Sequence, residues 1–449
     1  MRFKLLLFIL AFVFLPVDSW AATITADSCS LAHVTAAYNA AMEGDRVVIP
    51  AGECTWTSEL TVLKAITILG AGSGAGGTKI TLDSGLHAGA IVISLATTSL
   101  VRVSGIYFDK VYNHTSSSYA INIMTPSASD SITQLRIDHC RFDYGKYALN
   151  ISGDIQGVVD NNYFLNCNAS IQKLGKSTGW DDPIVAGMDM GLNTLYIEDN
   201  EFVRDSSLTC GSQNFHIESG HGGRFIVRYN TFDGSDYCKT ECTASCGGAC
   251  YTDYHVMPHG NMYYYSDPSH STMRGHPIME VYNNTFMANR LDYSGMIFRG
   301  GSVLVHDNDT TTLTCTPNSS YYLREEEADG TPTFSIQRTE WPAEDQIFNS
   351  FFWNNTINGN PITSIHINVS TFIQEDRDYF MHAPAETGGK ETFTDRPGAA
   401  GSHPTDGDPY ADTGTMTFSS SGSNAYYPYT PFTYPHPLRK PSAPAPRIQ

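Results

Sequence analysis

Between residues 216 and 299 the sequence concentrates side chains that could act as bases, acids and charge neutralisers. His216 and Glu218 alternate with Phe215 and Ile217, so we expect both to project from the outer face of one strand. More imidazole, carboxylate and guanidinium groups follow within a short stretch of chain. The candidate catalytic residues are His216, Glu218, His221, Arg224, Arg228, Arg274, Glu280 and Arg299.

These residue types suit the cleavage of polysaccharides that contain uronic acids. In β-elimination a base removes the proton α to a carboxylate, while a cation or an arginine stabilises the charge that develops. Hydrolysis of a glycosidic bond instead uses two carboxyl groups. Elimination is expected ahead of hydrolysis, because the fragments Gly179-Trp180-Asp181-Asp182 and Gly220-His221-Gly222 resemble polygalacturonase hydrolases only in part, and no Asn-Thr-Asp or Arg-Ile-Lys segment accompanies them.

A short pattern recurs along the chain and predicts the elements that would position these groups. In each copy a strand-like segment ends in Asn, any residue, and Phe. Clear copies end in Asn162-Tyr163-Phe164, Asn200-Glu201-Phe202, Asn230-Thr231-Phe232 and Asn284-Thr285-Phe286. Where no loop intervenes, the spacing is 22 residues from Phe142, in a weaker copy with Cys140 in place of Asn, to Phe164, and 24 residues from Asn284 to Asn308. About 22 residues is the length of one coil of a parallel β-helix.

The residue three positions before the Asn is aliphatic in every copy, and the residue two positions before it is polar in most. This alternation predicts a strand with one buried and one open face. The aliphatic column comprises Ile137, Val159, Ile197, Val227, Val281 and Val305.

The polar column begins with three carboxylates, Asp138, Asp160 and Glu198. If these copies stack about 4.8 Å apart, each adjacent pair repels by roughly 3.5 kcal/mol at an effective dielectric constant of 20. A Ca²⁺ ion with oxygen ligands would balance this charge. The alternatives are that arginines such as Arg136 balance it, that the acids only shape turns, or that loops keep them apart.

The segment from Ala36 to Gly74 resembles the N-terminal cap and first coils of secreted proteins of the pectate-lyase-like superfamily. The recurring asparagines resemble the internal asparagine ladder of that fold. The resemblance implies an all-β chain: a single-stranded right-handed parallel β-helix (a solenoid) with an N-terminal capping helix and long inserted loops. Leu31, Val34, Tyr38 and Ala41 fall on one face of the expected helix. The superfamily includes lyases, hydrolases and noncatalytic proteins, so the resemblance leaves activity open.

Three parts of the chain are distinguished by composition. Residues 1–21 read as a signal peptide, with Arg2 and Lys4 before an apolar run that is too short to span a bilayer. Residues 22–374 are expected to form the β-helix, with loops at about 166–190, 205–214, 233–275 and 309–347. Residues 375–449 are expected to form an irregular wrap with a Pro-rich tail.

The ten cysteines are consistent with disulfides in an exported protein. Cys29 and Cys54 are expected to close the N-terminal region. Four further cysteines, from Cys238 to Cys250, recur every fourth residue; two disulfides or a metal cluster could follow from that spacing.

The net charge of −19 excludes an electrostatic nucleic-acid binder. We therefore expect a secreted carbohydrate-active β-helix protein that cleaves an acidic polysaccharide by β-elimination or hydrolysis, with Ca²⁺ as the candidate cofactor. The alternative is a noncatalytic extracellular protein that binds a glycan or a protein partner. No membrane span is expected, and the sequence does not indicate an oligomeric state.

Overall fold

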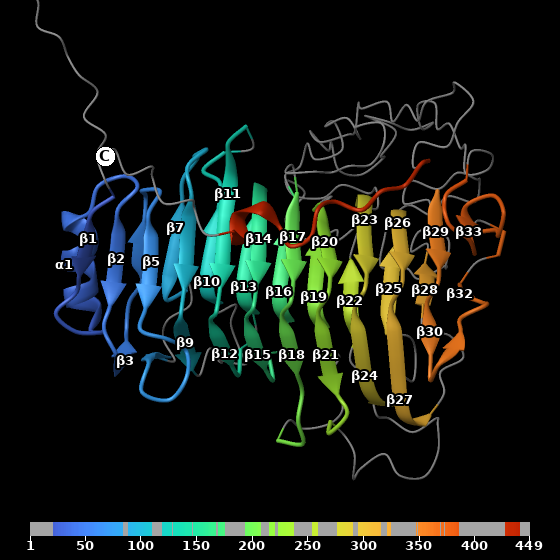
Figure 1. Cartoon of the computed structure of the whole chain (residues 1–449), viewed down its shortest axis with the longest axis horizontal. Coiled ribbons are helices and arrows are strands. Elements are labelled where there is room, and N and C mark those ends of the chain that lie inside the picture. The colour runs from blue at the N-terminus through green and yellow to red at the C-terminus, as the bar shows by residue number, and fades with distance from the viewer. Residues whose placement is uncertain are drawn as a thin grey trace, which may run out of the picture.

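A computed structural model describes most of the predicted β-helix, one short segment beyond it, and not the first twenty residues. The described residues are 21–83, 89–109, 119–127, 129–145, 147–167, 169–175, 194–207, 215–220, 223–237, 254–258, 276–290, 295–315, 321–324, 347, 349–368, 370–371, 373–385 and 427–440. The strands within these ranges form three long sheets, called A, B and C here, and neighbouring strands within a sheet come from successive coils (Figure 1).

Almost all strand pairs are parallel, and each coil contributes a strand to each sheet in turn. Sheet A consists of β1 (Thr23–Thr25), β2 (Arg46–Ile49), β5 (Thr67–Gly70), β8 (Val101–Ser104), β11 (Ser131–Asp138), β14 (Asp154–Asp160), β17 (Leu195–Glu198), β20 (Phe225–Arg228), β23 (His276–Tyr282), β26 (Gly301–His306), β29 (Ser350–Trp353) and β33 (Tyr379–Phe380). Sheet B consists of β3 (Gly52–Trp56), β6 (Thr78–Leu82), β9 (Ile106–Asp109), β12 (Arg141–Asp143), β15 (Tyr163–Leu165), β18 (Glu201–Val203), β21 (Thr231–Gly234), β24 (Thr285–Arg290), β27 (Asp309–Cys315), β30 (Thr356–Ile357) and β31 (Asn360–Pro361).

Sheet C consists of β4 (Leu60–Val62), β7 (Ile91–Ser94), β10 (Tyr119–Met124), β13 (Tyr147–Ser152), β16 (Ala169–Leu174), β19 (Phe215–Gly220), β22 (Tyr254–Pro258), β25 (Met296–Arg299), β28 (Tyr321–Arg324) and β32 (His366–Ile367). The molecule is therefore the predicted right-handed parallel β-helix. Strands β16, β22, β27 and β28 lie within segments that the sequence predicted as loops. The predicted loops are thus shorter than expected, because each of these segments returns to complete a coil.

The recurring asparagines form a buried ladder at the turn between sheets A and B. The side-chain amide of Asn200 donates to the side-chain oxygen of Asn230 over 3.0 Å, and Asn230 donates in the same way to Asn284. Each amide also donates to the backbone carbonyl of a residue in the preceding coil, such as Val159 O for Asn200. The ladder satisfies polar groups inside the protein, as buried amides require.

Aromatic and aliphatic side chains fill the bore of the β-helix. Phe164, Phe202 and Phe232 stack with ring centroids 4.6 to 4.8 Å apart. The predicted aliphatic column is fully buried, as Ile197 and Val227 illustrate. The recurring Asn and Phe positions therefore hold the coils in register.

A short helix closes the N-terminal end of the bore. Helix α1 spans Leu31–Ala40, and the Ser30 side chain caps it by accepting a hydrogen bond from the backbone N–H of His33. Val34 and Tyr38 are on the buried face of this helix, and a disulfide joins Cys29 to Cys54. The predicted cap and N-terminal disulfide are confirmed. No helix of the described ranges is long and apolar enough to cross a membrane.

A segment far along the chain lies across the outer face of sheet A. Residues 427–440, which we call the strap, include a short 3-10 helix, Pro437–Arg439. Tyr429 contacts His306 of β26, and the backbone carbonyl of Leu438 accepts from Arg136 of β11. The strap thus runs across several coils, opposite to the direction in which they stack (Figure 1).

Candidate functional site

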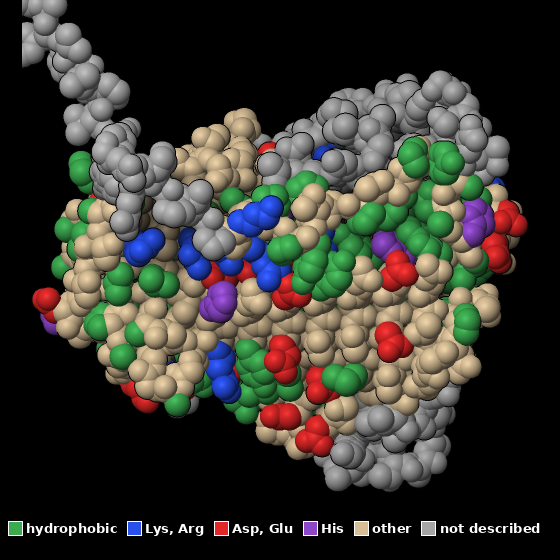
Figure 2. Space-filling view, in the orientation of Figure 1, with side chains coloured by type: hydrophobic (Ala, Val, Ile, Leu, Met, Phe, Trp, Pro, Cys, Tyr) green, Lys and Arg blue, Asp and Glu red, His purple; other side chains and the backbone are tan. Residues whose placement is uncertain are grey.

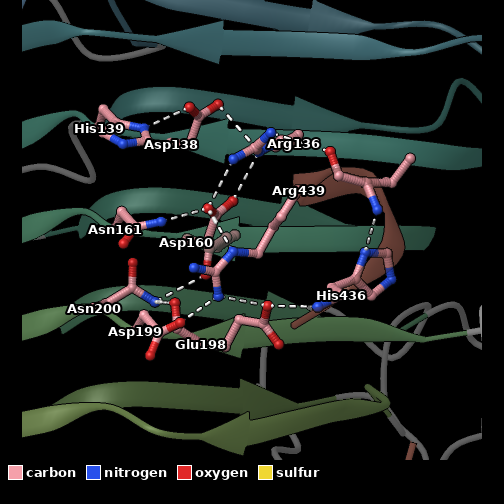
Figure 3. Close-up of polar contacts among 12 residues, drawn as sticks. Arg136, Asp138, His139, Asp160, Asn161, Glu198, Asp199, Asn200, His436 and Arg439 are labelled. Carbon is pink, nitrogen blue, oxygen red and sulfur yellow. Dashed lines mark hydrogen bonds and ion pairs between the residues drawn. The ribbon is translucent and has the colours of Figure 1, made fainter. Parts of the chain in front are cut away.

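The three carboxylates of the polar column lie in register on consecutive strands of sheet A. Asp138 pairs with Asp160, and Asp160 with Glu198, and all three side chains are fully buried. Each of the three carboxylates is paired with an arginine side chain. Arg136 donates to both oxygens of Asp160 at 2.9 and 3.0 Å, and Arg228 bonds Glu198 (Figure 3 shows Arg136 and the three acids).

The strap adds a further guanidinium to this column. Arg439 binds Glu198 at 2.8 Å, Asp160 at 3.2 Å and also Asp199. The stacking of Asp138, Asp160 and Glu198 is as predicted, but arginines balance the charge that suggested calcium. Among the described residues, no group of three or more His, Cys, Asp or Glu side chains is arranged to hold a metal ion. A calcium requirement therefore stays a prediction without support from this column.

Two predicted catalytic residues lie beneath the strap. The Arg228 side chain is fully buried and donates to the backbone carbonyls of Phe432 and Thr433. Glu280 is 2 % exposed and accepts a hydrogen bond from the Tyr429 hydroxyl at 2.8 Å. A polysaccharide could reach neither side chain while the strap is in place.

His216 lies inside the β-helix, so the prediction that it projects from the outer face is wrong. Its ring centroid is 5.6 Å from that of Phe202 and 5.5 Å from that of Phe232, and both phenylalanines belong to the core. The ring of His255, at the equivalent position of the next coil, stacks on it at 5.6 Å. At this corner two consecutive residues of the strand point inward, which simple alternation does not anticipate.

Burial keeps both of these imidazoles neutral. Burial, together with the nearby Arg204 guanidinium, lowers the pKa of His255 to about 3 and lowers that of His216 well below its ordinary value. No ring nitrogen of either histidine has a hydrogen-bond partner within the described structure. His216 therefore cannot serve as a base for an external polysaccharide.

The other predicted catalytic residues lie elsewhere. Glu218 lies on the outer face of β19 in sheet C, where it accepts a 3.4 Å hydrogen bond from Gln172. Arg299 lies on the same face of β25, two strands further along the sheet. Arg224 is half-buried just before β20. His221 and Arg274 lie outside the described residues. The candidates that can be placed therefore divide between sheets A and C and the bore, and any catalytic role of Glu218, Arg224 and Arg299 stays a prediction.

Basic side chains gather on the N-terminal half of sheet A. Arg46, Arg102 and Arg136 occupy equivalent strand positions, with Thr67 between the first two. The end of the strap brings Arg439 and Lys440 beside them. Figure 2 shows Lys and Arg side chains collected over this part of the face. We call Arg46, Arg102, Arg136, Arg439 and Lys440 the basic row.

The basic row stands above carboxylates that are hidden from solvent. The side chains of Arg102 and Arg439 are 28 % and 16 % exposed, whereas those of Asp138 and Asp160 are not exposed at all. Arg46 and Lys440 are exposed and form no ion pair with any residue that the structure describes. A ligand that approaches this surface therefore meets cations first.

One exposed histidine adjoins the basic row. His139 follows Asp138, its side chain is 60 % exposed, and its Nδ1 lies 2.7 Å from Asp138 Oδ2 (Figure 3). Arg102 binds the same carboxylate through Nε and Nη2, both at 2.6 Å. Burial alone would raise the pKa of Asp138, but the hydrogen bond from Arg102 and the nearby Arg136 and His139 outweigh it and lower that pKa.

No pattern in the sequence singled out Arg102, His139 or the strap residues as part of a site. Asp138 was predicted as a site residue because it precedes a ladder position. His139 follows it directly, so a position close to the same carboxylate could have been expected for that histidine. Arg102 belongs to a faint copy of the repeat, and Arg439 is brought to the site from a position 241 residues after Glu198. No spacing in the sequence predicts that last contact.

Comparisons with known proteins find only distant similarity. No family model matches the sequence, and no curated protein matches it. Among solved structures, an alginate lyase from Paenibacillus sp. strain FPU-7 is 9 % identical, with a TM-score of 0.38 over 77 % of this chain and 91 % of that one. A PL6 family alginate lyase is 15 % identical, with a TM-score of 0.37 over 77 % of this chain and 46 % of its own.

The catalytic domain of a GH87 α-1,3-glucanase, in complex with nigerose, is 12 % identical, with a TM-score of 0.35 over 78 % of this chain and 64 % of that one. The match to the PL6 alginate lyase covers less than half of that protein's length. Similarity this low supports no statement about the activity of this protein.

Proposed function

We propose that this chain is a secreted carbohydrate-active β-helix protein that binds an acidic polysaccharide along the basic row of sheet A. One observation carries the proposal: an overall charge of −19 is combined with a surface on which cations are exposed above buried carboxylates. The buried acids fix the guanidinium groups in place, so little side-chain entropy is lost when a ligand binds.

The spacing of the basic row suits an extended, repeating ligand. Arg46 and Arg102, whose side chains reach the surface, lie two strands apart on sheet A, roughly 10 Å along the axis. This distance is of the same order as the length of two sugar residues, so alternate uronates of one chain could meet these two cations. Guanidinium groups bind carboxylates through paired, charge-assisted hydrogen bonds.

Export is supported by the disulfide between Cys29 and Cys54, because such bonds persist in oxidising compartments. We infer that the bound polymer contains uronic acids and that cleavage, where it occurs, proceeds by β-elimination rather than by hydrolysis. A role in binding without cleavage is the alternative, and the same assay separates the two.

A binding assay tests the proposal. Polygalacturonate, alginate and a glycosaminoglycan are compared with a neutral glucan, at low and high salt, with Ca²⁺ and with a chelator. We expect the acidic polymers to bind and the neutral one not to bind. Salt should weaken the binding, because exposed charges are screened over about 10 Å at an ionic strength of 0.1 M.

Two neutralising substitutions identify the surface. Arg46→Gln combined with Lys440→Gln should lower the affinity for the acidic polymers roughly tenfold, since each residue would lose one charge-assisted contact. Lys79→Gln, on sheet B, removes a unit charge from another face and should leave the affinity unchanged. Equal affinity in the double variant and the wild type would overturn the proposal.

The products of the incubation distinguish the modes of action. Ultraviolet absorbance from an unsaturated uronate would indicate β-elimination, and new reducing ends without that absorbance would indicate hydrolysis. Binding with neither product would favour the noncatalytic alternative.

A further inference from the structure

The geometry points to a β-elimination centre around Asp138, in which His139 is the base and Arg102 binds the carboxylate of the uronate that is cleaved. This inference rests on the proposed function and names the residues that would act within the basic row. It differs from the sequence-based prediction, which placed the chemistry at residues 216 to 299.

One oxygen atom of Asp138 contacts both groups. His139 Nδ1 lies 2.7 Å from Asp138 Oδ2, and Arg102 Nη2 lies 2.6 Å from the same atom. The two nitrogens are therefore no further apart than two hydrogen-bond lengths. In a uronate, the carboxylate and the acidic proton are attached to the same carbon, so one sugar residue could reach both groups.

The hydrogen bond to Asp138 also sets the state of the imidazole. An ionised carboxylate only accepts hydrogen bonds, so it favours the tautomer with the proton on Nδ1 and leaves the lone pair on Nε2. No described residue bonds Nε2. Because the His139 side chain is 60 % exposed, a polymer lying on sheet A can approach that nitrogen.

Arg102 retains a donor for the substrate. Its Nε and Nη2 bond Asp138, and Nη2 also lies 3.4 Å from Ser104 Oγ, whereas Nη1 bonds no residue that the structure describes. The nearby Arg136 Nε lies 3.5 Å from Asp138 Oδ1 and adds positive charge. These guanidinium groups would stabilise the charge that forms on the uronate carboxylate as its α proton leaves.

The reaction balances without an oxidant, a reductant or water. His139 Nε2 takes the proton from the carbon α to the carboxylate. The electron pair of that bond forms a double bond to the β carbon, and the bond from the β carbon to the glycosidic oxygen breaks. The departing oxygen takes a proton from the solvent or from the imidazolium, which gives an unsaturated uronate and a new hydroxyl end.

Replacing His139 by glycine tests this assignment with little structural cost. The backbone φ angle of His139 is +54°, a left-handed conformation that glycine adopts readily. His139→Gly should lower the rate of unsaturated-uronate formation at least about a hundredfold, the usual contribution of a general base. Free imidazole should restore part of that rate, because the missing ring leaves space beside Asp138.

A matched control lies one coil further on. Asn161 has the same φ angle, +54°, at the equivalent turn after Asp160. Asn161→Gly should cleave within about twofold of the wild type and should not respond to imidazole. Both variants should bind the polymer with unchanged affinity and unfold at similar temperatures.

The outcomes separate this inference from the proposed function. Cleavage by His139→Gly at the wild-type rate, or an equal loss in Asn161→Gly, would overturn the assignment of His139. Wild-type protein that binds acidic polymers but never forms the unsaturated product would overturn this inference and leave the proposed binding function intact. Failure to bind any acidic polymer would instead remove the proposed function itself.

Discussion

Two histidine sites in this molecule differ in almost every respect that decides reactivity. His139 is exposed, bonded to an ionised carboxylate and surrounded by arginines on sheet A. His216 and His255 are 1 % exposed and stack on each other and on phenylalanines, and their ring nitrogens have no hydrogen-bond partner in the described structure. The first site can exchange protons with a ligand, whereas the second can only influence the stability of the fold.

The contrast shows that residue type does not by itself identify a catalytic histidine. The segment from residue 216 to 299 was predicted to be catalytic because it is rich in histidine, but His216, its first histidine, packs inside the bore. Ala120, Ala148 and Ser170 occupy the same position in earlier coils, and all of them are buried. The larger imidazole rings therefore replace small side chains at an inward-facing corner.

The largest effect we expect is a loss of stability on acidification. The pKa of His255 falls from 6.5 in the unfolded chain to about 3 in the folded protein. The unfolded chain therefore binds more protons between these values. The stabilisation is complete above about pH 6.5 and is lost as the pH falls through that range, by about 3 kcal/mol at pH 4 for this residue.

Chemical denaturation at pH 7 and at pH 4 measures this loss. His216 should add to it, since its pKa is also lowered, and the positive charge of Arg204 acts on both rings in the same direction. An unfolding free energy that changes by less than about 1 kcal/mol between the two pH values would contradict the assignment of neutral, buried imidazoles.

A smaller effect should come from removing one of these rings. His255→Leu introduces an apolar side chain of similar size, so its stability at pH 7 should remain within about 1.5 kcal/mol of the wild type. At pH 4 the variant should be more stable than the wild type by about 1.5 to 3 kcal/mol, because it has no imidazole to protonate. The carboxylates titrate alike in both proteins, so the difference between them isolates His255.

The outcome that would count against this explanation is a variant that loses as much stability on acidification as the wild type. In that case the acid sensitivity would reside in the ion pairs of sheet A, such as Arg136 with Asp160, and not in the buried histidines.

The parts of the fold that repeat could be predicted, and the parts that do not repeat could not. Val227 and Asn230 are separated by the same three positions as Ile197 and Asn200, and copies of this pair recur along the chain, so the core, the ladder and the parallel stacking follow from local alternation. The corner where His216 turns inward departs from that alternation. It could be recognised only from the position of Phe202 and Phe232 across the bore.

The candidate site was predictable only in its acidic half. Asp138, Asp160 and Glu198 recur at one position of the repeat, so their stacking was expected. Their arginine partners come from other columns and, for Arg439, from the strap. A contact between residues more than two hundred positions apart depends on how the chain returns after its last coil, which no local pattern encodes.

The smallest effect should follow from substitution of the exposed histidine. His139→Asn keeps a residue that tolerates the left-handed turn conformation and can still donate to Asp138. Because this contact is exposed and screened by solvent, the unfolding free energy should change by less than about 1 kcal/mol. A large destabilisation at pH 7 would mean that His139 is chiefly a structural partner of Asp138, and would weaken its assignment as a base.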